Sequence, residues 1–144
     1  MEEVLRSLAL FKPELALTAG LLLVVIADAI GGPWRNATVR ALTLVSLVAA
    51  LGFAFGQTAS GPIFSGMLVV DPLGSAFKVI LVAAALLTVL AFSFRNSREL
   101  HGLGQGELYA LVLALTLSSL LLAAANDIVM LYLALEMVSV TSYV

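Results

Sequence analysis

Five apolar stretches, each about as long as the core of a bilayer is thick, dominate this chain of 144 residues. They cover approximately residues 14–30, 39–55, 72–94, 107–125 and 127–144, with short polar segments between them. An α-helix of about 20 apolar residues crosses a hydrocarbon core of about 30 Å. The pattern therefore predicts an all-α fold. We expect an integral membrane helical bundle of about five transmembrane helices, forming a single transmembrane region over residues 1–144.

The composition supports lipid as the solvent and narrows the chemistry. The chain is 62% hydrophobic and 11% charged, and its mean hydropathy is +1.13. So few charges cannot cover the surface of a soluble domain of this size. There is no cysteine, which excludes disulfides and cysteine-bound iron–sulfur clusters, and the one histidine, His101, lies in a charged segment. We therefore expect no cofactor and no metal in this chain. The sequence has no basic patch of the kind that binds nucleic acid, so we expect no nucleic-acid partner.

Local signals predict where several helices begin and end. Asp71-Pro72 has the order of an N-cap followed by proline in the first turn, and Gly31-Gly32-Pro33 is typical of a helix end. The run 67–70 is too short to span a membrane and predicts an extended or interfacial segment. The last apolar run reaches Val144 without a polar flank. We therefore expect an N-terminal piece of a longer protein, with a complete five-helix protein as the alternative.

The distribution of arginine predicts the orientation. Arg35 and Arg40 follow the first run, Arg95 and Arg98 follow the third, and the connection after the second run has no basic residue. Basic residues collect in cytoplasmic loops. We therefore expect a multi-pass protein of the cell inner (plasma) membrane with its N-terminus on the outer, periplasmic side.

Glu136 is the main candidate for chemistry. It lies nine residues after Asp127, roughly 13 Å along the helix and near the middle of the bilayer. Tyr132, Ser139 and Tyr143 share its helix face. A row of hydroxyls and a carboxylate suits a proton path, because each group can donate or accept a hydrogen bond. Intramembrane acids are usually functional. The alternative is a structural glutamate bound to a basic residue on another helix.

Lys78 is the second candidate, about 10 Å into the helix that starts at Asp71. Its long stem can extend toward the interface and keep the ammonium group in water. Otherwise it pairs with a carboxylate elsewhere in the bundle, where desolvation disfavours its charged form and makes it a candidate proton carrier.

Several stretches resemble subunit N, an antiporter-like membrane subunit, of the proton-pumping NADH:quinone oxidoreductase (respiratory complex I). The similarity covers nearly the whole chain. It lies in Pro13-Glu14-Leu15, Ala27-Asp28, Phe64 to Pro72, Phe77-Lys78, Gly106 to Leu111, Ala125 to Ile128, Tyr132 to Glu136 and Ser139 to Tyr143.

The resemblance implies a part of an antiporter-like fold built largely from inverted repeats. It implies a membrane-arm subunit that contributes to proton translocation coupled to electron transfer from NADH to quinone. Glu136 matches the family's mid-membrane glutamate, whose partner lysine lies on a later helix. Flavin, iron–sulfur clusters, NADH and quinone would be handled by partner subunits, and the other partners would be membrane subunits and lipid. The alternatives are a subunit of a multisubunit cation/proton antiporter and a purely structural membrane subunit.

Overall fold

The structure is a computed structural model that describes residues 7–57, 60–94 and 105–143. Its helices and strands, in chain order, are α2 (Lys12–Ile30), α3 (Arg35–Phe55), β1 (Gly61–Ile63), β2 (Leu68–Val70), α4 (Pro72–Phe94), α5 (Gln105–Ala124) and α6 (Ile128–Tyr143). Four of the helices, α2 to α5, are long and apolar enough to cross a membrane. The 16 residues of α6 extend about 24 Å. The predicted all-α membrane helical bundle is confirmed.

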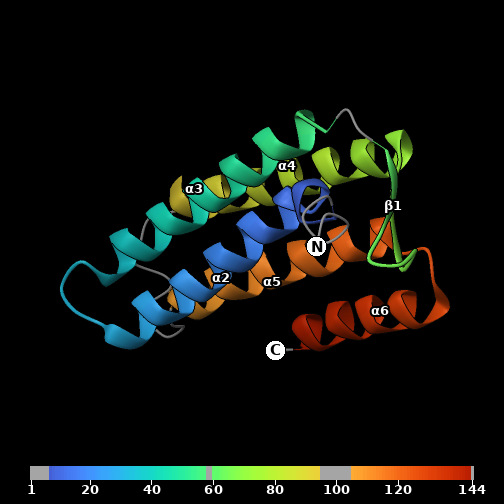
Figure 1. Ribbon diagram of the computed structural model, residues 1–144. Coiled ribbons are helices and arrows are strands. Elements are labelled where there is room, and N and C mark those ends of the chain that lie inside the picture. The colour runs from blue at the N-terminus through green and yellow to red at the C-terminus, as the bar shows by residue number, and fades with distance from the viewer. Residues whose placement is uncertain (1–6, 58–59, 95–104, 144) are drawn as a thin grey trace.

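The four long helices form the packed part of the bundle, and α6 lies at its edge (Figure 1). Helix α2 packs against α3 and α5, while α4 packs against α3 and α5 from the other side. Helix α6 runs beside α5 and packs mainly against it. The packed part therefore has helix neighbours on several sides, whereas α6 has neighbours on one side.

The helix ends follow local chemistry. The Gly74 backbone N–H donates to Asp71 Oδ1 at 2.8 Å, which confirms the predicted cap of α4. Gly31 and Gly32 have φ values of 69° and 111° just after α2, a backbone that favours glycine. Helix α3 begins at Arg35, earlier than the predicted residue 39. The apolar run marks only the part of this helix that lipid contacts, because a helix can continue with polar residues into the interface.

A two-stranded hairpin closes one end of the bundle. Strands β1 and β2 are antiparallel, with Gly61 opposite Val70, so the extended segment predicted for residues 67–70 is confirmed. The Asn126 side chain donates to the Gly66 carbonyl at 2.9 Å. On the other side, the Phe64 and Phe11 rings meet edge to face at 5.2 Å. The hairpin therefore links the start of α2 to the connection between α5 and α6 (Figure 1).

Small residues permit close approach between the long helices. A side-chain carbon at Gly20 of α2 would collide with Ser46 of α3. The Ser46 hydroxyl donates to the Leu42 carbonyl in its own helix, so this polar group is satisfied inside the seam. Outward-facing positions carry large apolar side chains, as a membrane requires. Examples are Leu22, Ile26, Val45, Ile80 and Leu87.

Candidate functional site

Lys78 of α4 forms a buried ion pair with Glu14 of α2. Its Nζ lies 2.5 Å from Glu14 Oε1, and the two side chains are 1% and 0% exposed. The pair confirms one of the two arrangements predicted for Lys78, and the alternative in which its ammonium group reaches the interface is wrong. A role for Lys78 in proton transfer stays a prediction.

Both charged residues lie on the buried faces of their helices. On α4, Gly74, Lys78, Val82 and Val89 are buried, a spacing that repeats about every turn of an α-helix. On α2 the buried positions are Pro13, Glu14, Leu17, Gly20 and Val24. Each charge therefore replaces an apolar residue in a stripe that packs against other helices. This placement explains why neither side chain is exposed on the surface of the bundle.

The ion pair satisfies only part of the hydrogen-bonding capacity of its two groups. Apart from the 2.5 Å contact, neither Glu14 oxygen nor Lys78 Nζ has a hydrogen-bond partner among the described residues. An ammonium group has three donors, and a carboxylate has about four acceptor sites. Buried polar groups in folded proteins are almost always satisfied by protein or ordered water. The pair is therefore a costly and under-satisfied element of the core.

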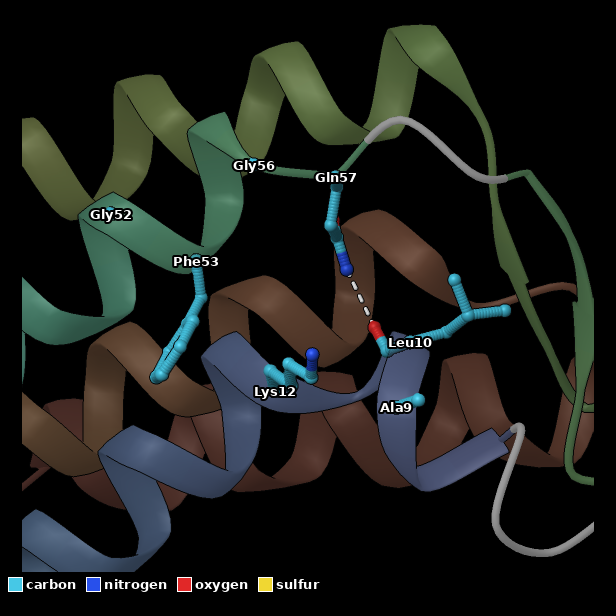
Figure 2. A pocket seen from close by; sticks show the side chains of 7 residues that line it. All are labelled: Ala9, Leu10, Lys12, Gly52, Phe53, Gly56 and Gln57. Carbon is cyan, nitrogen blue, oxygen red and sulfur yellow. Dashed lines mark hydrogen bonds between the residues drawn. The ribbon is translucent and has the colours of Figure 1, made fainter.

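A cavity of about 430 Å³ lies at the hairpin end of the bundle, between the start of α2 and the end of α3. Figure 2 shows Gln57 pointing toward the backbone of Leu10, just before α2. Its Nε2 donates to the Leu10 carbonyl at 2.5 Å. The Ser75 hydroxyl of α4 donates to Gln57 Oε1 at 3.5 Å, the long limit of a hydrogen bond. The cavity is lined by Ala9, Leu10, Lys12, Gly52, Phe53, Gly56 and Gln57.

Glu136 and its neighbouring hydroxyls lie on the exposed side of α6. Tyr132 and Tyr143 are 66% and 89% exposed, and Glu136 and Ser139 are exposed as well. Tyr132 precedes Glu136 by one helical turn on the same face of α6. In α6 the structure buries only Ala134. The predicted polar stripe is thus present on one helix, but the packed helices do not cover it, and its role in proton transfer stays a prediction.

The two predicted sites remain separate. Within residues 7–57, 60–94 and 105–143, ion pairs are formed by Glu14 with Lys78 and by Asp28 with Arg35, and none includes Glu136. A group of three or more metal-binding side chains is also absent from these residues. Glu14 was not singled out from the sequence as a partner for Lys78. The spacing of Glu14, Leu17 and Val24 places them on one face of α2, and the structure shows that this face is buried.

Asp28 lies near the end of α2 that is opposite the hairpin. Its Oδ1 is 3.5 Å from Arg35 Nε, and a side chain at Gly106 of α5 would collide with its carboxylate. The glycine therefore allows the start of α5 to approach the end of α2. The other basic residues expected at this end, Arg95 and Arg98, lie outside the described residues, as does His101.

Comparison with known proteins identifies relatives along the whole chain. It is 36% identical over 150 aligned positions to NADH-quinone oxidoreductase subunit N of Anaeromyxobacter sp. (strain Fw109-5), covering 100% of this chain and 28% of the relative. It is 37% identical to NADH-quinone oxidoreductase subunit N 1 of Solibacter usitatus, covering 93% and 27%. It is 34% identical to NAD(P)H-quinone oxidoreductase subunit 2 of Synechococcus sp. (strain JA-3-3Ab), covering 91% and 25%. No family model matches the chain. The chain thus spans about a quarter of the length of these curated relatives.

Proposed function

Because the chain is a homologue of NADH-quinone oxidoreductase subunit N along its whole length, we propose that it is part of a membrane subunit of that complex and contributes to proton translocation. The translocation is coupled to electron transfer from NADH to quinone. The observation that carries the proposal is Glu136, an ionisable side chain on an apolar helix with Tyr132 beside it. Ionisable side chains within membrane helices usually mark pathways for ions or protons.

The proposed chemistry is a switch between two states of the Glu136 carboxylate. A basic side chain on a helix packed against the exposed face of α6 stabilises the charged form. When the two groups separate, the carboxylate lacks a countercharge in an apolar environment and takes up a proton. Tyr132, Ser139 and Tyr143 hold water or pass the proton along the helix face.

Redox chemistry is assigned to partner subunits. With no cysteine in its sequence, the chain offers no ligands of the kind that hold iron–sulfur clusters. The iron–sulfur clusters are therefore assigned to other chains of the complex, and we assign flavin, NADH and quinone to partner subunits as well. The contribution of this chain to the overall reaction is a path for protons.

The proposed location is the cell inner membrane, with the hairpin end on the outer side. Arg35 lies at the end of the bundle opposite the hairpin, and basic residues favour the cytoplasmic side. The chain lacks cysteine, so single cysteines at Asn36 and Ser60 report the orientation. An impermeant thiol reagent added outside intact cells is expected to label Ser60→Cys and not Asn36→Cys. The reverse labelling would contradict the orientation.

The function is tested by Glu136→Gln in the assembled complex. Glutamine keeps the shape of the side chain but cannot bind or release a proton. We expect the rate of proton pumping to fall by about a hundredfold or more, because a positioned proton-transfer group typically contributes about 10²–10⁴-fold in rate. The matched control is Glu107→Gln at the exposed start of α5, which leaves pumping unchanged. Normal pumping with a less stable assembly would instead identify Glu136 as a structural residue.

A further inference from the structure

The Glu14–Lys78 pair lies close in sequence to the cavity at the hairpin end, because Glu14 follows the cavity residue Lys12 by two positions and Lys78 follows Ser75 by three. We propose that the pair is a second, water-accessible proton-exchange site, with Gln57 and Ser75 forming its entrance. The ligand is a proton delivered by water from the aqueous phase at this end of the bundle. The site uses only residues of this chain, and it stands whether or not Glu136 carries protons.

The pair is buried but incompletely hydrogen-bonded. Both side chains are fully buried, yet Glu14 Oε2 and the remaining donors of Lys78 have no hydrogen-bond partner among the residues that the structure describes. The buried hydroxyls nearby differ in this respect. Thr43, Ser46, Thr116 and Ser118 each donate to a carbonyl four residues earlier. Of the four buried side-chain atoms without a hydrogen-bond partner among the described residues, three belong to the pair and the fourth is Asp28 Oδ1. A water molecule at the pair would therefore find several partners.

Polar side chains mark a route for water from the aqueous phase toward the pair. The cavity wall includes Gln57, and Ser75 donates to the Gln57 side-chain oxygen. Ser75 and Lys78 lie three residues apart on α4 and so share a helix face. Lys78 is six residues past Pro72, or about 9 Å along the helix. A short polar path, two turns of helix deep, therefore leads from the cavity toward the pair.

Few other charges lie near the pair along the packed helices. Residues 41–55 of α3 and 108–124 of α5 contain no charged residue. The nearest charged groups along the chain are Lys12, in the cavity wall, and Asp71, which accepts from the Gly74 N–H. Glu14 and Lys78 thus depend on each other for compensation, because the charged residues of α3 and α5, which are Arg35, Arg40 and Glu107, lie near the opposite end of the bundle.

The exchange reaction is simple and balanced. A hydronium ion transfers one proton to the Glu14 carboxylate, which gives a carboxylic acid and one water molecule. Lys78 keeps its three protons and is left as a cation without a countercharge. Return of the proton to water restores the ion pair, so that the site binds and releases one proton in each cycle.

Water access is tested by thiol labelling of the full protein in lipid nanodiscs. Since the chain has no cysteine, labelling of one introduced thiol can be read from the mass of this chain alone. The test positions are Ser75→Cys, and Lys78→Cys combined with Glu14→Gln. The controls are Ala76→Cys and Ile80→Cys, which lie at similar depths on the exposed face of α4. The probe is sulfonatoethyl methanethiosulfonate, which is ionised and reacts with thiolates in water.

We expect both test positions to react about tenfold or more faster than their controls, because the thiolate forms only where water reaches it. Adding Gln57→Leu is expected to slow both reactions by removing the polar entrance. Equal rates at test and control positions would overturn the proposal, and so would rates that Gln57→Leu leaves unchanged.

Proton exchange is tested by infrared spectroscopy of Lys78→Met. Without its countercharge, Glu14 is expected to become a neutral acid, with a carboxylic C=O band that is absent when Glu14→Gln is added. Transfer to D₂O shifts this band within minutes if water reaches the site. An unshifted band would overturn the proposal, and if Lys78→Met does not fold, the labelling rates decide.

Discussion

Glu14 and Glu136 are the same residue type on two apolar helices of one chain, yet their surroundings are opposite. Glu14 is completely buried and lies 2.5 Å from Lys78. Glu136 is exposed on α6, with Tyr132 as its polar neighbour. The first carboxylate has its countercharge inside the bundle, whereas the second shows none among the described residues.

The difference separates what holds this fold together from what the fold presents to others. A buried charge without a partner is strongly unfavourable, so the packed helices must keep Glu14 and Lys78 together. Glu136 places no such demand on α2 to α5. A membrane-embedded acid on an uncovered face still needs a polar environment, so its partner must come from a group that packs against α6. We therefore expect substitution of the Glu14–Lys78 pair to lower the stability of the fold, and substitution of Glu136 to leave the stability almost unchanged.

Lys78→Met is expected to have the largest effect on stability. Removing one member of a buried pair leaves Glu14 without its countercharge, so that it must stay charged or take up a proton, and breaking such a pair costs about 3–5 kcal/mol. The measurement is the free energy of unfolding of the full protein in nanodiscs or mild detergent. Glu136→Met is the matched control and should cost much less. Equal losses at the two positions would remove the distinction between them.

Gly20→Val comes next and tests close packing without any charge. A side chain at this position collides with Ser46 of α3, and overpacking of this kind costs about 1–3 kcal/mol. Ala19→Val, on the exposed side of the same helix, is expected to change the thermal midpoint little. If the two variants unfold at the same temperature, Gly20 of α2 and Ser46 of α3 do not pack in direct contact.

The double variant Glu14→Leu/Lys78→Met should recover most of the stability lost in Lys78→Met. Replacing both members of a buried ion pair with apolar residues is often neutral or stabilising, and we expect a free energy within about 1 kcal/mol of the parent protein. The comparison is made by equilibrium unfolding of the parent, the single variants and the double variant. Failure to recover would mean that the pair itself supplies net stability.

Glu136→Gln is expected to have the smallest effect on stability. Substitutions at exposed positions without structural partners usually change the free energy by about 0.5 kcal/mol or less. Thermal unfolding of the variant beside its parent gives this value, while proton pumping falls as stated above. A loss of several kcal/mol would show that α6 uses Glu136 to hold the bundle.

The sequence predicted the elements well because membrane helices are marked by local features. Length and hydropathy indicated α2 to α6, and Asp71-Pro72 indicated the start of α4, since a cap depends on residues within one turn. The beginning of α3 was misplaced by four residues because hydropathy does not mark the polar first turn that starts at Arg35.

The pairing of Glu14 with Lys78 could not be derived in the same way. In a soluble helix the buried face is the apolar face, but lipid and protein core are both apolar, so hydropathy does not distinguish them in a membrane helix. Which face of α2 turns toward Lys78 depends on the packing of the whole bundle, and Glu14 and Lys78 lie 64 positions apart in the sequence. The spacing of Glu14, Leu17 and Val24 becomes informative only once one of these residues is known to be buried.

The position of Glu136 in the complete membrane protein tests the account most directly. The measurement is an experimental structure of the assembled complex, at a resolution that shows side chains. We predict that the Glu136 carboxylate lies within about 4 Å, the distance of an ion pair, of a basic side chain or of water in a polar cavity. A carboxylate that points into the acyl chains of the lipid would contradict the account.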